Sequence, residues 1–141
     1  ELINLQKTMG VVEGVARGVD LFACVMPTRN ARKGQVFTAD GPLTISHARY
    51  ARDPAPLEAG CPCEGCRGFS RAYLRHLFMA RELLAYRLLS LHNVTFYLGL
   101  MAAMRGALAA GGFRAFRSRF LDRYGVESHD GSPDSTRDTE A

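Results

Sequence analysis

The sequence of 141 residues contains no tryptophan and no apolar run of the roughly 20 residues that a membrane-spanning helix needs. Its first ten residues also lack the basic, apolar and small-residue zones of a secretory signal. These absences argue against membrane and secreted proteins, so we expect a cytoplasmic protein without a membrane partner. A chain of this length normally forms one domain and can bury a core of useful size.

Acidic residues are scarce outside the C-terminal tail. The whole chain has a net charge of +4, but residues 125–141 hold five acidic residues and one arginine, leaving 17 basic against 9 acidic residues in the body. A basic body suits a phosphate-rich partner such as a nucleic acid, although many basic surfaces bind nothing in particular. The tail has almost nothing to bury and is predicted to be disordered.

Only a few segments have the pattern of β-strands. The apolar run 21–26, LFACVM, is typical of a buried strand in a parallel sheet, and a basic loop over 28–33 is expected to follow it after Pro27. Two short β-prone runs, 35–38 and 43–45, flank Ala-Asp-Gly-Pro and predict a hairpin. A helix that turns into a strand is expected before residue 20.

The second half of the chain is predicted to be helical. Apolar residues at three- and four-residue steps predict an amphipathic helix over 71–90 that Ser70 can cap. A second helix is expected over 93–110, ended by Gly111-Gly112, and a short basic helix over 113–124.

Three of the four cysteines lie within six residues of a loop rich in Pro and Gly, in the run Cys61-Pro-Cys-Glu-Gly-Cys66. Thiols this close do not easily pair within the motif, and a cytosolic chain would not keep them oxidised. Three soft ligands on a turn suit a tetrahedral zinc ion, with free, partly buried cysteines as the alternative. The candidates for a fourth ligand are Cys24, His47, His76, His92 and His129. Position favours His92 over His76, because the chain can turn back past the loop after the predicted helix.

Four ordered motifs carry a family resemblance: VDLFACVMPTRNARKGQVFT, the CxCxxC run, SRAYLRHL and LHNVTFYLGLM. Together they resemble the C-terminal third of the bacterial tRNA-guanine transglycosylases, over about residues 15–124. The resemblance implies an α/β fold: the C-terminal part of a (β/α)8 barrel with an inserted zinc-binding subdomain, mostly helical in this fragment. It implies an enzyme that exchanges guanine at the tRNA wobble position for a 7-deazaguanine precursor of queuosine.

The same resemblance implies roles for individual residues. It implies one structural zinc ion on Cys61, Cys63, Cys66 and His92. It implies that Thr28, Arg29 and Arg32 belong to the loop that holds the tRNA anticodon, whereas a merely solvated basic loop is the alternative. Phe69, Tyr73 and His76 fall where the family has an aromatic cluster at its homodimer interface, and core packing of their helix is the alternative.

The sequence departs from the family at the catalytic nucleophile. The family has an Asp directly before the Cys-Val of the first motif, and here that position is Ala23, whose methyl group cannot attack a ribose carbon. The second catalytic Asp and most base-pocket residues of the family lie in earlier strands that this sequence does not contain. We therefore expect a chain that is inactive alone, within a homodimer or beside a complementing catalytic subunit; a non-catalytic zinc-containing tRNA-binding subunit is the alternative.

The expected organisation has four parts. Residues 1–38 would form the end of a barrel with its RNA-binding loop, 39–92 the hairpin and zinc-binding subdomain, 93–124 the C-terminal helices and 125–141 the disordered tail. Because a complete (β/α)8 barrel needs about 250 residues, the chain is expected to be one end of a larger protein.

Overall fold

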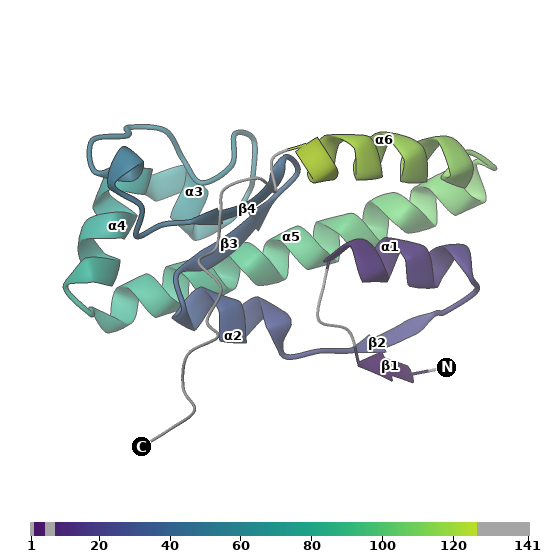
Figure 1. Cartoon of the computed structure of the whole chain (residues 1–141), viewed down its shortest axis with the longest axis horizontal. Coiled ribbons are helices and arrows are strands. Elements are labelled where there is room, and N and C mark those ends of the chain that lie inside the picture. The colour runs from purple at the N-terminus through teal and green to yellow at the C-terminus, as the bar shows by residue number, and fades with distance from the viewer. Residues whose placement is uncertain (1, 5–7, 127–141) are drawn as a thin grey trace, which may run out of the picture.

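One long helix, α5 (Leu83–Ala109), runs through the whole arrangement and contacts elements from both halves of the chain (Figure 1). The structure is a computed structural model that describes residues 2–4 and 8–126. The 27 residues of α5 correspond to about 40 Å of helix. Two separate apolar clusters form along this length, one that uses Leu88 and Leu89 and one that uses Leu100 and Met104.

The N-terminal elements form a small β-α-β unit. Strand β1 (Leu2–Asn4) pairs in parallel with β2 (Leu21–Ala23), and helix α1 (Thr8–Ala16) lies between them in the sequence. The prediction of a buried strand over 21–26 is wrong here: β2 ends at Ala23, and Leu21 is 68% exposed. Among the described residues only β1 pairs with β2, so an apolar strand suited to a covered sheet remains open to solvent.

A helix replaces the predicted basic loop after β2. Helix α2 (Met26–Arg32) carries Pro27 in its first turn, where the missing N–H group would have had no helical partner. Gly34 follows with φ +79°, and a Cβ atom there would lie 2.7 Å from the Phe78 ring. Glycine is therefore needed at this position, where the chain turns toward the next strand and passes close to the Phe78 ring.

The predicted hairpin is confirmed. Strand β3 (Gln35–Thr38) pairs antiparallel with β4 (Gly41–Thr44) across the two-residue turn Ala39-Asp40. The second strand thus begins two residues earlier than expected. The two sheets of the described residues are both two-stranded, so the barrel stays a prediction, whereas the mostly helical character of the chain is confirmed.

The segment with the CxCxxC run, residues 61–66, follows one short helix and overlaps the start of the next. The 3₁₀ helix η1 (Ala48–Tyr50) precedes it, α3 (Glu64–Gly68) begins within it and α4 (Arg71–Met79) follows. Ser70 caps α4 as predicted, because its Oγ accepts the Tyr73 N–H at 3.1 Å.

The prediction of one helix over 71–90 is wrong, because the helix is interrupted after Met79. Arg81 adopts φ 58°, and the Arg81 and Glu82 N–H groups bond to carbonyls in the last turn of α4. This is a Schellman-type helix end with arginine in the position that usually holds glycine. Helix α5 then starts at Leu83, continues through the second predicted helix and ends at Ala109, shortly before Gly111 (φ +70°), as expected.

Helix α6 (Phe113–Val126) closes the second apolar cluster against α1 and α5. Arg117 donates to Glu13 of α1 at 2.7 Å, and Arg123 forms an ion pair with Asp40 in the hairpin turn. The predicted basic helix is confirmed and extends to Val126; the rest of the predicted tail, 127–141, lies outside the described residues. The division into four parts stays a prediction, and α5 runs through its boundary at 92/93.

Candidate metal centre

The three cysteines of the CxCxxC run converge because a turn leads directly into α3. The Cys61 N–H donates to the Glu58 carbonyl at 3.3 Å, which turns the chain before the motif. Cys63 is the N-cap of α3, and its Sγ accepts the Cys66 N–H at 3.3 Å. The capped turn therefore brings the second and third sulfur atoms to the same side of α3.

The fourth side chain comes from the middle of α5. His92 is fully buried, and its Nδ1 lies 3.6, 3.6 and 3.3 Å from the Sγ atoms of Cys61, Cys63 and Cys66. Gly65 of α3 lies against α5, because a Cβ atom there would be in van der Waals contact with the Leu88 carbonyl oxygen at 3.4 Å.

The four side chains fit one zinc ion. All four potential ligand atoms lie within 4.8 Å of one another. A tetrahedral site with Zn–S of about 2.3 Å and Zn–N of about 2.0 Å places its nitrogen about 3.5 Å from each sulfur, close to the three distances seen here. The predicted zinc cofactor and its Cys61, Cys63, Cys66 and His92 group are thus confirmed as a compatible set. Four protein ligands leave no position for substrate, so the site is structural.

Burial determines the protonation of the ligand side chains when no metal ion is bound. Burial raises the pKa of Cys61 and of Cys66 above the usual value for a thiol, and the neighbouring cysteines contribute to both shifts. Burial likewise lowers the pKa of His92, so the imidazole is neutral at pH 7. Without a metal ion, burial therefore favours the neutral forms of Cys61, Cys66 and His92. A bound zinc ion would instead favour deprotonation of the thiols, because it binds them as thiolates.

The groups behind the ligands were not predicted from the sequence. His92 Nε2 lies 2.8 Å from the Phe37 carbonyl oxygen of β3, to which it donates when Nδ1 faces the metal. The neighbouring Asn93 is also fully buried and accepts the Phe37 N–H at 3.0 Å. Glu58 accepts the Ala39 N–H at 2.6 Å and so ties the loop to the hairpin turn. The available signal in the sequence was that His92 and Asn93 are two adjacent polar residues on the apolar face of a helix.

The predicted RNA-contacting residues lie on α2 and not on a loop. Thr28 and Arg29 are half-buried in the first turns of the helix, whereas Arg32 is exposed near its end. Thr28 Oγ1 donates to the Val25 carbonyl at 3.3 Å. Ala23, at the position of the family's nucleophile, is exposed as the last residue of β2. The structure does not test the roles of these residues.

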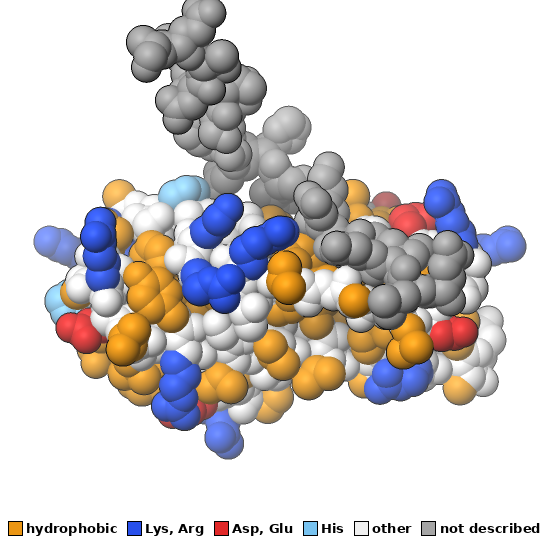
Figure 2. Space-filling view, turned by 90° about the horizontal axis from the view of Figure 1, so that it is seen from below, with side chains coloured by type: hydrophobic (Ala, Val, Ile, Leu, Met, Phe, Trp, Pro, Cys, Tyr) orange, Lys and Arg blue, Asp and Glu red, His pale blue; other side chains and the backbone are white. Residues whose placement is uncertain are grey.

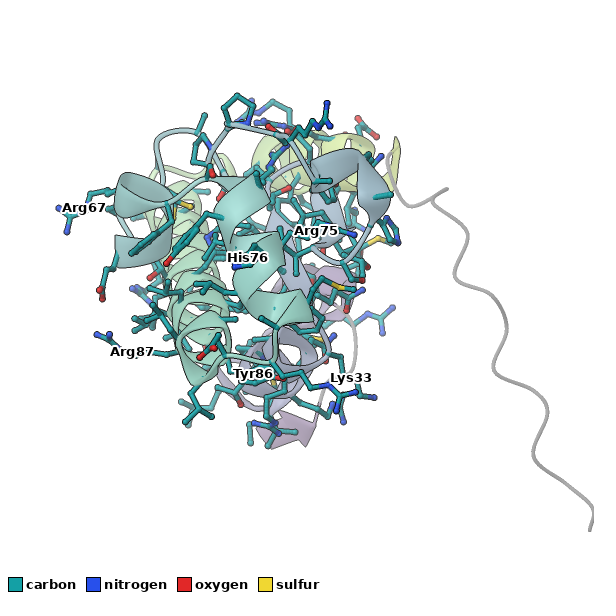
Figure 3. The ribbon with its side chains drawn as sticks, turned by 90° about the vertical axis from the view of Figure 1, so that its left-hand side faces the viewer. Lys33, Arg67, Arg75, His76, Tyr86 and Arg87 are labelled. Carbon is teal, nitrogen blue, oxygen red and sulfur yellow. The ribbon has the colours of Figure 1, made fainter. Side chains whose placement is uncertain are left out.

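The predicted dimer residues lie together at the outer side of α4. The rings of Phe69 and Tyr73 stack with centroids 5.5 Å apart, and the His76 ring lies 6.4 Å from that of Tyr73. Tyr73 is 43% exposed, whereas Phe69 packs against the first apolar cluster. Figure 3 shows His76 on the side of α4 that faces the viewer, beside Arg75.

Among residues 2–4 and 8–126, the structure contains no helix with the length and apolar character of a membrane span.

The fold and the site define a mostly helical zinc-binding domain with a Cys3His centre that a hairpin and one long helix support. The family model described as queuine tRNA-ribosyltransferase matches residues 2–126. The chain therefore belongs to the queuine tRNA-ribosyltransferase family.

Relatives with the printed name queuine tRNA-ribosyltransferase agree with this assignment. The protein of Syntrophobacter fumaroxidans is 64% identical over 114 residues, which cover 80% of this chain and 31% of the relative. The protein of Symbiobacterium thermophilum is 54% identical over 123 residues, 87% of this chain and 31% of the relative. That of Caulobacter vibrioides is 50% identical over 123 residues, 87% and 33% of the two chains. The chain thus spans about a third of the length of these relatives.

Proposed function

We propose that this chain is the zinc-binding and RNA-contacting part of a tRNA-guanine transglycosylase of the cytoplasm. The reaction would exchange guanine at the tRNA wobble position for a 7-deazaguanine precursor of queuosine. The observation that carries the proposal is the Cys3His centre inside a family match that extends over nearly all described residues. In this proposal the metal fixes the fold around α5 and takes no part in the base exchange.

Helix α2 supplies the RNA contact in this proposal, through Thr28, Arg29 and Arg32. Neither arginine has an ion-pair partner among the residues that the structure describes, so both guanidinium groups are available for phosphates or unstacked bases. Figure 2 shows the face on which α2 lies in Figure 1, with basic side chains among apolar ones and acidic groups toward the edges of the visible surface.

The test is binding of an unmodified anticodon stem-loop to the zinc-loaded chain. We expect Arg29→Ala/Arg32→Ala to weaken binding by tenfold or more and to reduce the slope of log affinity against log salt by about 1.4, the value for two lost contacts to single-stranded phosphates. The control Arg105→Ala/Arg119→Ala removes the same charge from exposed positions on α5 and α6. Equal effects of the two double variants would show non-specific attraction and contradict the role of α2.

The chain itself performs no base exchange in this proposal. Retaining exchange needs a carboxylate that attacks the ribose carbon and is displaced by the incoming base, and Ala23 offers only a methyl group at that position. We expect no incorporation of labelled guanine into unmodified cognate tRNA above background. Incorporation by the chain would contradict the proposal, because another residue would then have to act as the nucleophile.

Two copies of the chain, or the chain and a catalytic subunit, would meet at the surface formed by Phe69, Tyr73 and His76. Its stacked, partly exposed rings suit a protein interface, where aromatic residues are enriched. We expect Tyr73→Ala to lower the sedimentation-derived mass at concentrations where the parent chain associates. Leu83→Ala, at an 82% exposed apolar position at the start of α5, is the control and should leave association unchanged. The alternative of a non-catalytic tRNA-binding subunit rests on Ala23, and RNA binding together with association only to a second, catalytic chain would favour it.

A further inference from the structure

Asn93 makes an unusually complete set of hydrogen bonds for a buried side chain. It has no exposed surface, and its Oδ1 accepts the Phe37 N–H at 3.0 Å. Its Nδ2 donates to the Pro27 carbonyl at 2.9 Å and to the Gln35 carbonyl at 3.0 Å. An apolar side chain of the same size would lose all three of these hydrogen bonds, so packing alone does not account for an amide here.

The three partners connect α5 to two different elements. Phe37 and Gln35 belong to β3, whereas Pro27 lies in the first turn of α2. The N–H and C=O groups of Phe37 are held by adjacent residues of α5, Asn93 and His92, the second at 2.8 Å. One residue of the strand is therefore held through both of its backbone polar groups, by a predicted metal ligand and by the amide that also contacts α2.

Helix α2 is short, and it packs against α5 and β3. It has seven residues, and its polar link to β3, apart from Asn93, is the bond from Asn30 Nδ2 to Gln35 Oε1 at 2.6 Å. Its buried side chains, Met26 and Ala31, lie on the face toward the core. Apolar contacts of this kind restrict the direction of a helix less than hydrogen bonds do. The bond from Asn93 to Pro27 reaches the helix in the turn that also carries Arg29.

We propose that Asn93 is a positioning residue that fixes α2, and with it Arg29 and Arg32, relative to the zinc centre. The metal holds His92, His92 and Asn93 together hold β3 through Phe37, and Asn93 holds the start of α2. The part that concerns RNA rests on the function proposed for α2 above, whereas the link between zinc centre and helix stands on the hydrogen bonds alone.

The test compares Asn93→Asp and Asn93→Ala with a control on the same helix. Aspartate has nearly the same shape and can still accept the Phe37 N–H, but it has no donor for the two carbonyls. Alanine removes all three bonds without adding charge. Met104→Ala is the control, because Met104 is buried in the second apolar cluster, which contains no residue of α2. Each zinc-loaded full chain is measured for zinc content, amide hydrogen exchange and binding of the anticodon stem-loop.

We expect both Asn93 variants to keep one zinc per chain and to exchange the amides of residues 29–34 about tenfold faster than Met104→Ala, as the loss of two donated hydrogen bonds predicts. Binding of the stem-loop should weaken about tenfold, with a salt slope close to that of Arg29→Ala/Arg32→Ala.

Unchanged exchange over residues 29–34, or the same increase in Met104→Ala, would overturn the proposal. Loss of zinc from both Asn93 variants would also overturn it, because the residue would then act through the metal. Faster exchange with unchanged RNA binding would refute the positioning role if Arg29→Ala/Arg32→Ala does weaken binding. If that double variant has no effect either, it is the proposed role of α2 in RNA binding that fails. The exchange data alone then test whether Asn93 fixes α2 relative to the zinc centre.

Discussion

Replacement of Cys61 by serine should remove the zinc ion while leaving the rest of the centre almost unchanged. Cys61 is half-buried, and serine has nearly the same shape but is a far poorer zinc ligand. At a free zinc concentration about 100-fold above the dissociation constant, bound zinc stabilises the fold by about 2.7 kcal/mol. For a domain of this size we expect the Tm to fall by about 10 °C when that contribution is lost.

The matched variant His92→Ala should cost more, since His92 has a second role. Its Nε2 lies 2.8 Å from the Phe37 carbonyl oxygen, and its ring is fully buried. Besides the zinc contribution, the variant leaves a carbonyl unpaired, at about 1–3 kcal/mol, and opens a cavity in the core. We therefore expect His92→Ala to unfold at a clearly lower temperature than Cys61→Ser, both with zinc and with a chelator.

The assay is thermal unfolding followed by far-UV circular dichroism, with zinc content measured on the same samples. A chelator should lower the Tm of the parent chain to that of Cys61→Ser and should leave the variant itself unchanged. The reasoning is refuted if Cys61→Ser retains one zinc and the parent Tm, or if the chelator strips zinc from the parent chain without lowering its Tm.

Further predictions concern protons and one tight turn. Because burial raises the pKa of Cys61 and Cys66, zinc binding at pH 7 should release at least their two protons and weaken about 100-fold for each pH unit lowered; calorimetry in buffers of different ionisation enthalpy counts the protons. Burial raises the pKa of Tyr124 to about 12, so its contribution of about 3 kcal/mol is complete below pH 10 and is lost as the pH rises toward 12; alkaline unfolding that is equally steep in Tyr124→Phe would contradict this. Gly34→Ala should destabilise the fold by more than 1 kcal/mol in urea unfolding, because φ is +79° and the ring of Phe78 lies in the way, whereas Gly68→Ala, with open space around it, should have little effect.

The zinc centre could be predicted because its chemistry is local. Three thiols in six residues restrict the possible roles before any fold is known, and only the fourth ligand requires knowledge of where the chain returns. The hairpin and the end of α5 just before Gly111 were likewise predicted from residues that favour turns. These features depend on side chains that lie next to one another in the sequence.

The wrong predictions involve a residue type common in two kinds of structure, a residue in an unusual conformation, and contacts between distant parts of the sequence. Pro27 was interpreted as the start of a loop, although proline is well suited to the first turn of a helix. Arg81 gave no sign of a left-handed helix end, because glycine usually occupies that position. The bonds of Asn93 reach backbone groups 56, 58 and 66 residues away, so no local pattern identifies them.

The open strand β2 has a consequence for the behaviour of the chain in solution. Its second edge pairs with no strand of the described residues, and Leu21 beside it is exposed. Such an edge is a row of free N–H and C=O groups next to apolar surface, which can accept an extended segment of another polypeptide. Concentrated samples are therefore expected to associate edge to edge, and a polypeptide that adds a strand here would act as a solubilising chaperone as well as a structural partner.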